Sequence, residues 1–101
     1  MTNGFKVRWS PEAEETFDAV IEYLNNKWSE KEVRNFVRKS NKVIEQIEKN
    51  PVQFKASSFH GIRKAFVTKH NSLLYGINEK DDIIELYTFW DNRQNPDKLR
   101  Y

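Results

Sequence analysis

Within the first thirty residues, the spacing of apolar residues changes from every second residue, as in a strand, to every third or fourth residue, as in a helix. Residues 5–9, FKVRW, alternate apolar and basic side chains, which is the pattern of a half-buried strand. Beyond Ser10 the apolar positions recur at three- and four-residue spacing as far as Trp28, which indicates a helix with one apolar face. Ser10 suits the N-cap of that helix and Pro11 its first position. We therefore predict a strand followed directly by a helix.

A second amphipathic stretch follows after a very short link. Ser29 and Glu32 have the spacing of a capping box, in which two side chains satisfy backbone N–H groups at a helix start. Helical spacing of apolar residues continues to Ile47, and Asn50-Pro51 ends it. Two helices joined by so short a link should pack as an antiparallel hairpin.

The second half of the chain has the pattern of a β-meander. Residues 62–68, 72–78 and 82–90 are rich in β-branched and aromatic residues, and short polar turns separate them. The predicted fold is therefore α+β with the element order β-α-α-β-β-β, in which an antiparallel sheet is covered on one face by a helix hairpin. We expect a single domain spanning residues 1–101.

The amino-acid composition excludes several kinds of chemical site. The chain has no Cys, which excludes disulfides and thiolate metal sites, and its two His lack the spacing of a metal site. It also has no glycine-rich phosphate loop, so we expect neither a metal nor a cofactor. No apolar run reaches the length of a membrane span and no signal peptide is evident. We expect a cytoplasmic protein without a membrane partner.

Positive charge is concentrated in the middle of the chain. Residues 31–70 contain ten Lys and Arg against three Glu, whereas the segments before and after have an acidic excess. Such a segment can face phosphates, as in a nucleic-acid-binding module without toxicity. A solvated helix face is the simpler interpretation of this pattern.

Three longer stretches resemble one protein family. They are KVRWSPEAEETFDAVIEYL, GIRKAFVTKHNSLLYGI and the tail FWDNRQNPDKL. Together they are similar to the RelE/ParE toxins of type II toxin–antitoxin modules, also known as plasmid stabilisation proteins, from about Lys6 to Leu99. The resemblance implies a compact toxin fold, growth arrest, and a cognate antitoxin protein that neutralises the toxin in a hetero-oligomer.

The two branches of this superfamily differ in target. RelE-branch members cleave mRNA in the ribosome, whereas ParE-branch members poison DNA gyrase and are not known to carry catalytic residues. The tail looks more like ParE tails, and the paired His-Tyr ending of some RelE-branch ribonucleases is replaced by Thr88-Phe89-Trp90-Asp91. The resemblance therefore implies a gyrase inhibitor, with a metal-independent, ribosome-dependent mRNA endoribonuclease as the alternative. Whether the chain is an enzyme stays open.

The endoribonuclease alternative has its own candidate residues. Cleavage through a ribose 2′-hydroxyl needs a base, an acid and positive charge on the phosphate. Strand alternation predicts that Tyr87 lies on the sheet face that the helices leave open, and Tyr87 there is either a catalyst or a packing residue. Arg93 is equally well explained as a tie to Asp91 or Asp97. The candidate catalytic set is Arg63, Lys69, Tyr87 and Arg93.

Binding of a target or an antitoxin calls for a different set. Aromatic residues beyond the needs of a small core are plausible anchors, because Trp and Tyr dominate interface energetics. For Trp28, packing in the core is the stronger interpretation, and His70 beside Asn71 is most simply a turn residue. Arg63 and Lys64 are consecutive in a strand, so they cannot both line one site. The candidate binding set is Lys6, Arg8, Tyr23, Trp28, Lys64, His70, Trp90 and Arg93.

Overall fold

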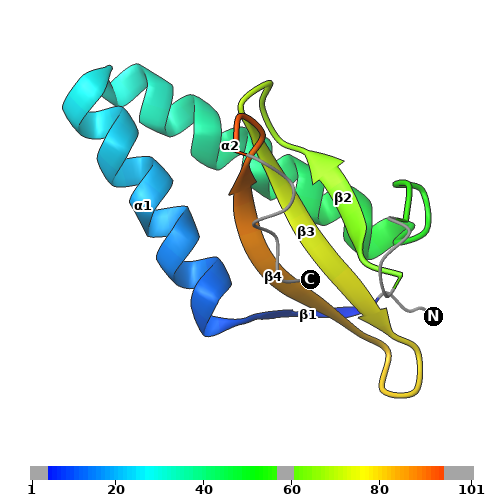
Figure 1. Cartoon of the computed structure of the whole chain (residues 1–101). Coiled ribbons are helices and arrows are strands. Elements are labelled where there is room, and N and C mark those ends of the chain that lie inside the picture. Colours follow the sequence, from blue (N-terminus) through cyan, green and yellow to red (C-terminus); the bar gives the residue numbers. More distant parts are fainter. Residues whose placement is uncertain (1–4, 57–60, 95–101) are drawn as a thin grey trace.

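A sheet and a hairpin of two helices make up the protein in the computed structural model, which describes residues 5–56 and 61–94 (Figure 1). The predicted element order is confirmed. The elements are β1 (Lys6–Trp9), α1 (Pro11–Lys27), α2 (Glu30–Lys49), β2 (Arg63–Phe66), β3 (Asn71–Asn78) and β4 (Ile83–Asp91). His60, and the tail residues Asn95, Pro96 and Asp97, lie outside the described residues.

The helix starts follow the sequence signals only in part. Ser10 caps α1, because its Oγ accepts a hydrogen bond from the Ala13 amide at 2.9 Å, and Pro11 occupies the first turn as predicted. Ser29 also stands at the N-cap of α2, but its side chain makes no capping hydrogen bond. The capping box predicted for Ser29 and Glu32 is therefore wrong, although the position of the helix start is right.

The sheet is mixed, in the order β1-β4-β3-β2. The three C-terminal strands form the predicted antiparallel meander, whereas β1 pairs in parallel with β4, with Lys6 opposite Ile83. The antiparallel prediction therefore needs correction for β1. After β1 the chain enters α1 at once, and the strand comes to lie beside the last strand of the chain rather than extending the meander.

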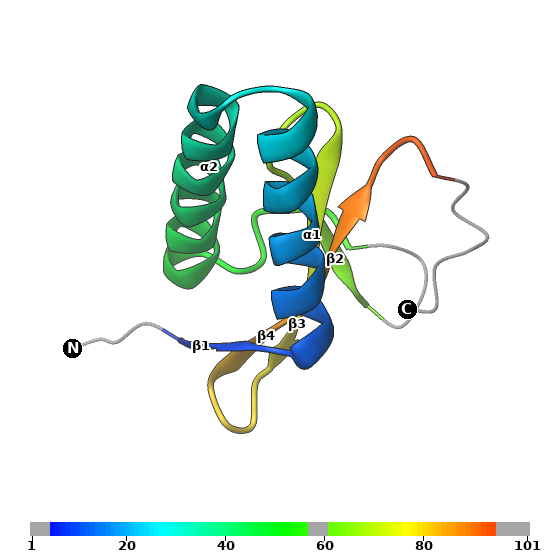
Figure 2. The same ribbon diagram turned by 90° about the vertical axis from the view of Figure 1, so that its left-hand side faces the viewer.

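Both helices lie on the same side of the sheet (Figure 2). Between them and the sheet, the rings of Trp9, Phe17, Phe36 and Phe89 pack with centroids 5.1–5.9 Å apart. Burial of apolar area is the dominant favourable contribution to folding, and each of these rings adds a large area to it. The predicted covering of one sheet face by the helix hairpin is confirmed.

Beyond the end of β1, Ser10 and Thr16 supply the hydrogen-bond partners of β4. The Ser10 amide donates to the Leu86 carbonyl at 3.0 Å and the Ser10 Oγ donates to the Tyr87 carbonyl at 2.8 Å. Nearly two turns further along α1, the Thr16 Oγ1 accepts from the Phe89 amide at 2.9 Å. These bonds satisfy backbone groups of β4 that β1 is too short to reach.

A β-bulge interrupts β4 at the same level. Leu74 of β3 pairs with Thr88, but the next residue, Tyr75, pairs with Leu86, which leaves Tyr87 as an extra residue. Because of this extra residue, Leu86 and Phe89, three positions apart, both belong to the core under the helices.

Candidate functional site

A groove opens between the two helices and one end of the sheet. Its walls come from α1, from the N-terminal half of α2, from the turn between β2 and β3, and from the end of β4, and it encloses about 820 Å³. We call it the strand-end groove. Five candidate binding residues and one further candidate catalytic residue line it, namely Tyr23, Trp28, Lys69, His70, Trp90 and Arg93.

Large aromatic side chains are exposed at this groove. Tyr23 is 46% exposed and Trp28 is 66% exposed, and both lie toward the C-terminal end of α1. The core interpretation of Trp28 is therefore wrong. An indole so open to solvent buries little of its area in this chain, which makes it suitable as an anchor for a partner.

Arg93 stands at the edge of the groove in a fixed position. Its Nε donates to Asp91 Oδ1 and its Nη2 donates to Asp91 Oδ2, each at 3.0 Å, and Tyr23 is a near neighbour of its guanidinium. The hydrogen bond from the Arg93 guanidinium holds the pKa of Asp91 below its usual value. The Arg93 side chain is still 59% exposed, so its remaining N–H groups face solvent at the groove.

Asn92 is a positioning residue that sequence reasoning missed. Its amide N–H donates to the His70 carbonyl at 2.8 Å, its Nδ2 donates to the Lys69 carbonyl at 3.2 Å, and its Oδ1 accepts from Ser72 Oγ at 2.7 Å. These three bonds fix the end of β4 against the turn that carries Lys69 and His70. A polar residue directly after the last strand is the only signal in the sequence, and it is too common to be specific.

A second group of candidates lies on the sheet face away from the helices. Arg8 and Glu85 are opposite one another in β1 and β4 and form an ion pair at 3.3 Å. Tyr87 lies on this face, since its ring covers Gly76 of β3, and Lys6 shares the face by strand alternation. Burial, and secondarily the charge of Glu85, raise the pKa of Tyr87. A phenol with a raised pKa holds its proton at neutral pH and is a poor general base.

The side chains of Arg63 and Lys64 lie on opposite faces of the sheet. Arg63 pairs with the core residue Tyr75, so it lies on the helix side, where its Nη1 donates to the Phe54 carbonyl at 2.6 Å. Lys64 points to the other face, and its Nζ lies 5.3 Å from the centroid of the exposed Phe66 ring. The arginine therefore ties the loop after α2 to β2.

The four candidate catalytic residues do not form one site. Arg63 lies under the helices, Tyr87 lies on the opposite sheet face, and Lys69 and Arg93 line the strand-end groove. The groove itself brings together aromatic surface, a fixed guanidinium, a lysine and an imidazole. Such a set can bind a protein segment or an anionic group.

Within residues 5–56 and 61–94, no three His, Cys, Asp or Glu side chains are grouped closely enough to hold a metal ion. No helix in that part is both long and apolar enough to cross a membrane.

Comparison with known proteins gives a family and a fold. A family model described as the ParE toxin of the type II toxin–antitoxin system parDE matches residues 7–96. No curated protein sequence matches the chain.

Solved structures with the same fold come from several toxin–antitoxin systems. A chain of the chromosomal ParDE system from P. aeruginosa superposes with a TM-score of 0.72 at 12% identity, over 86% of this chain and 95% of that one. The RelBE2 toxin–antitoxin complex from Mycobacterium tuberculosis gives a TM-score of 0.58 at 14% identity, over 89% and 100%. The YoeB dimer from Staphylococcus aureus gives 0.58 at 18% identity, over 83% and 92%.

Proposed function

Because the chain belongs to the ParE toxin family of type II toxin–antitoxin systems, we propose that it arrests growth by inhibiting DNA gyrase and that a cognate antitoxin neutralises it. The observation that carries the gyrase proposal is the dispersal of the candidate catalytic residues over both faces of the sheet. A nuclease needs base, acid and phosphate-binding groups at one reacting atom. An inhibitor that acts by binding needs only an exposed, well-ordered surface.

The strand-end groove is the proposed contact surface of the toxin. It presents exposed Tyr23 and Trp28 beside the fixed guanidinium of Arg93, and Trp, Tyr and Arg are the residue types that most often dominate binding energy. The volume of about 820 Å³ suits a few anchoring side chains of a partner. Relatives crystallised as toxin–antitoxin complexes support an antitoxin as one of the partners.

A supercoiling assay tests the gyrase proposal. Purified protein should inhibit supercoiling of relaxed plasmid by gyrase, and Arg93→Ala should weaken the inhibition by at least about tenfold, as is common for an anchoring arginine. Lys80→Ala is the matched control, because it removes a cation from the β3–β4 turn, outside the groove. Full supercoiling activity in the presence of the folded wild-type protein would refute the proposal.

Binding of the antitoxin is tested separately. Calorimetric titration with the product of the adjacent gene should give a complex with one or more antitoxin chains, and Trp28→Ala should weaken it. An unchanged affinity of Trp28→Ala would place the antitoxin elsewhere, without bearing on gyrase.

The ribosome-dependent endoribonuclease is the second candidate. One observation favours it, since Lys69, His70 and Arg93 line the same groove and could together hold a phosphate and exchange a proton. Translating ribosomes with an end-labelled message test it directly. Cleavage that disappears in His70→Ala and Arg93→Ala supports the enzyme, and an intact message excludes it.

A further inference from the structure

The outer face of α2 carries a strip of basic side chains directly opposite the face that packs on the sheet. The buried residues of this helix are Phe36, Ser40, Val43 and Ile47. With about 100° per residue, five exposed cations fall within an arc of about 80° on the far side. They are Lys31, Arg34, Arg38, Lys42 and Lys49, and we call them the α2 basic strip.

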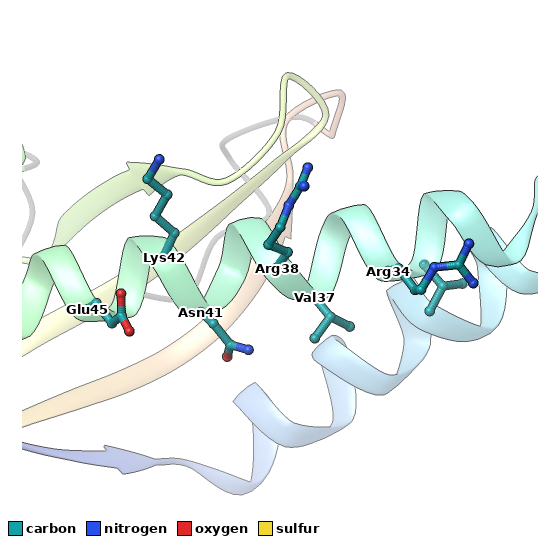
Figure 3. A pocket seen from close by; sticks show the side chains of 7 residues that line it. Arg34, Val37, Arg38, Asn41, Lys42 and Glu45 are labelled. Carbon is teal, nitrogen blue, oxygen red and sulfur yellow. The ribbon is translucent and has the colours of Figure 1, made fainter.

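The strip is an extended and rigid feature. With a rise of about 1.5 Å per residue, it runs for about 27 Å along the helix. Figure 3 shows the side chains of Arg38 and Lys42 projecting in the same direction, away from α1. The Nη2 of Arg38 donates to Asn35 Oδ1 at 2.7 Å, which restrains its guanidinium.

No ion pair among the described residues involves the cations of the α2 basic strip. Within residues 5–56 and 61–94, the ion pairs join Arg8 to Glu85 and Arg93 to Asp91, and neither involves the strip. Glu45 is the one carboxylate within the arc. Like charges four residues apart, such as those of Arg34 and Arg38, destabilise a helix. The row of cations therefore does not contribute to the stability of α2.

We propose that the α2 basic strip binds the phosphate backbone of double-stranded DNA without reading its sequence. The inference does not depend on the target of the toxin proposed above. Five cations on one straight face are complementary to a regular row of phosphates. B-DNA presents such phosphates along both edges of its major groove, and the groove, about 12 Å wide, is about as wide as an α-helix of about 10–12 Å.

Duplex DNA fits this face better than RNA does. The one aromatic residue of α2, Phe36, is buried in the core, so the strip offers no ring on which unpaired bases could stack. The deep, narrow major groove of A-form RNA does not admit side chains. An acidic protein surface is the other possible occupant, and it differs in lacking the regular spacing of charge.

Fluorescence anisotropy with the purified full-length chain and a labelled 20-bp DNA duplex tests the proposal. Affinity should fall with salt with a log–log slope of about −4 to −5 if all five cations contact phosphates. The triple variant Arg34→Gln, Arg38→Gln and Lys42→Gln should bind at least about tenfold more weakly and reduce the slope to about −2. Glu45→Gln should bind more tightly than the wild type.

The matched control removes the same charge elsewhere. The triple variant Lys27→Gln, Lys55→Gln and Lys80→Gln changes three exposed lysines outside the strip, and its slope should stay that of the wild type. Circular dichroism verifies that both triple variants are folded. Equal weakening of both variants would show general charge attraction and overturn the proposal. Tighter binding of single-stranded RNA, duplex RNA or polyglutamate than of duplex DNA would also overturn it.

Discussion

The Arg93 guanidinium donates two parallel hydrogen bonds of 3.0 Å to the carboxylate of Asp91, from Nε to Oδ1 and from Nη2 to Oδ2. The Arg93 amide N–H also donates to Asp91 Oδ1, at 2.9 Å. One carboxylate thus fixes both the backbone and the side chain of the residue that follows β4. Arg93 is held in one orientation before any partner arrives, which reduces the entropy that binding would cost.

Asp91→Asn should make the thermal stability of the protein less dependent on acid pH. The guanidinium lowers the pKa of Asp91 in the folded state, so its contribution to stability is complete above the unfolded value of about 3.9. That contribution is lost as the pH falls through the folded value. Melting temperatures measured by circular dichroism from pH 7 to pH 2.5 should therefore differ between wild type and variant at neutral pH and converge in acid. A difference that is constant over this range would contradict the assignment.

Gly76→Ala should disturb Tyr87. A Cβ at position 76 would lie 2.5 Å from the Tyr87 hydroxyl oxygen, closer than van der Waals contact allows. Moving the ring should cost about 1–2 kcal/mol, measured as the free energy of unfolding in urea. In a Tyr87→Ala background the same substitution should cost much less, because the collision is absent. Equal costs in both backgrounds would show that the ring is not what the methyl group meets.

Replacing either of two buried serines by alanine should change the free energy of unfolding, but in opposite directions. Ser40 in α2 has a buried Oγ without a hydrogen-bond partner among the described residues, and alanine is also the better helix former. Ser40→Ala should therefore stabilise the protein by about 0.5–1.5 kcal/mol. The equally buried Ser72 donates to Asn92 Oδ1 at 2.7 Å, so Ser72→Ala should destabilise by about 1–2 kcal/mol. Chemical denaturation of the two variants measures both values, and a destabilising Ser40→Ala would reveal a partner for that hydroxyl.

Thr16→Val should weaken the junction between α1 and β4. Valine keeps the shape of the side chain but removes the oxygen that accepts from the Phe89 amide, which leaves a partly buried N–H unpaired. The expected loss is about 1–2 kcal/mol of unfolding free energy. Thr16→Ser retains the oxygen and should lose clearly less. Faster hydrogen exchange of the Phe89 amide in Thr16→Val, but not in Thr16→Ser, would locate the effect.

The fold was largely predictable because each helix and strand shows in the spacing of its own apolar residues. The helical spacing around Phe17 and Phe36 and the alternation around Ile84 each identify an element without knowledge of its neighbours. The parallel pairing of β1 was not predictable in this way. It joins residues such as Lys6 and Ile83, whose proximity depends on how the helix hairpin returns the chain to the sheet.

The candidate site was predictable as residue types but not as an arrangement. Tyr23, His70 and Arg93 come from three distant segments, and only the meeting of α1, the β2–β3 turn and the end of β4 brings them to one groove. Alternation correctly separated Arg63 from Lys64, but the sequence could not show which of them faces the helices. The exposure of Trp28 was mispredicted because this residue is the C-cap of α1, where the helical spacing of apolar residues no longer tells which way a side chain points.

The parallel pairing of β1 with β4 also has a consequence for synthesis of the chain. Because β1 pairs with β4, the first strand has no partner in the sheet until Ile83 and the residues after it have been synthesised and have left the ribosome. Contacts between residues so far apart in sequence form late and slowly. A nascent chain that stops before Ile83 would therefore lack the completed sheet, so the surfaces that β1 and β4 build together exist only after β4 has been made.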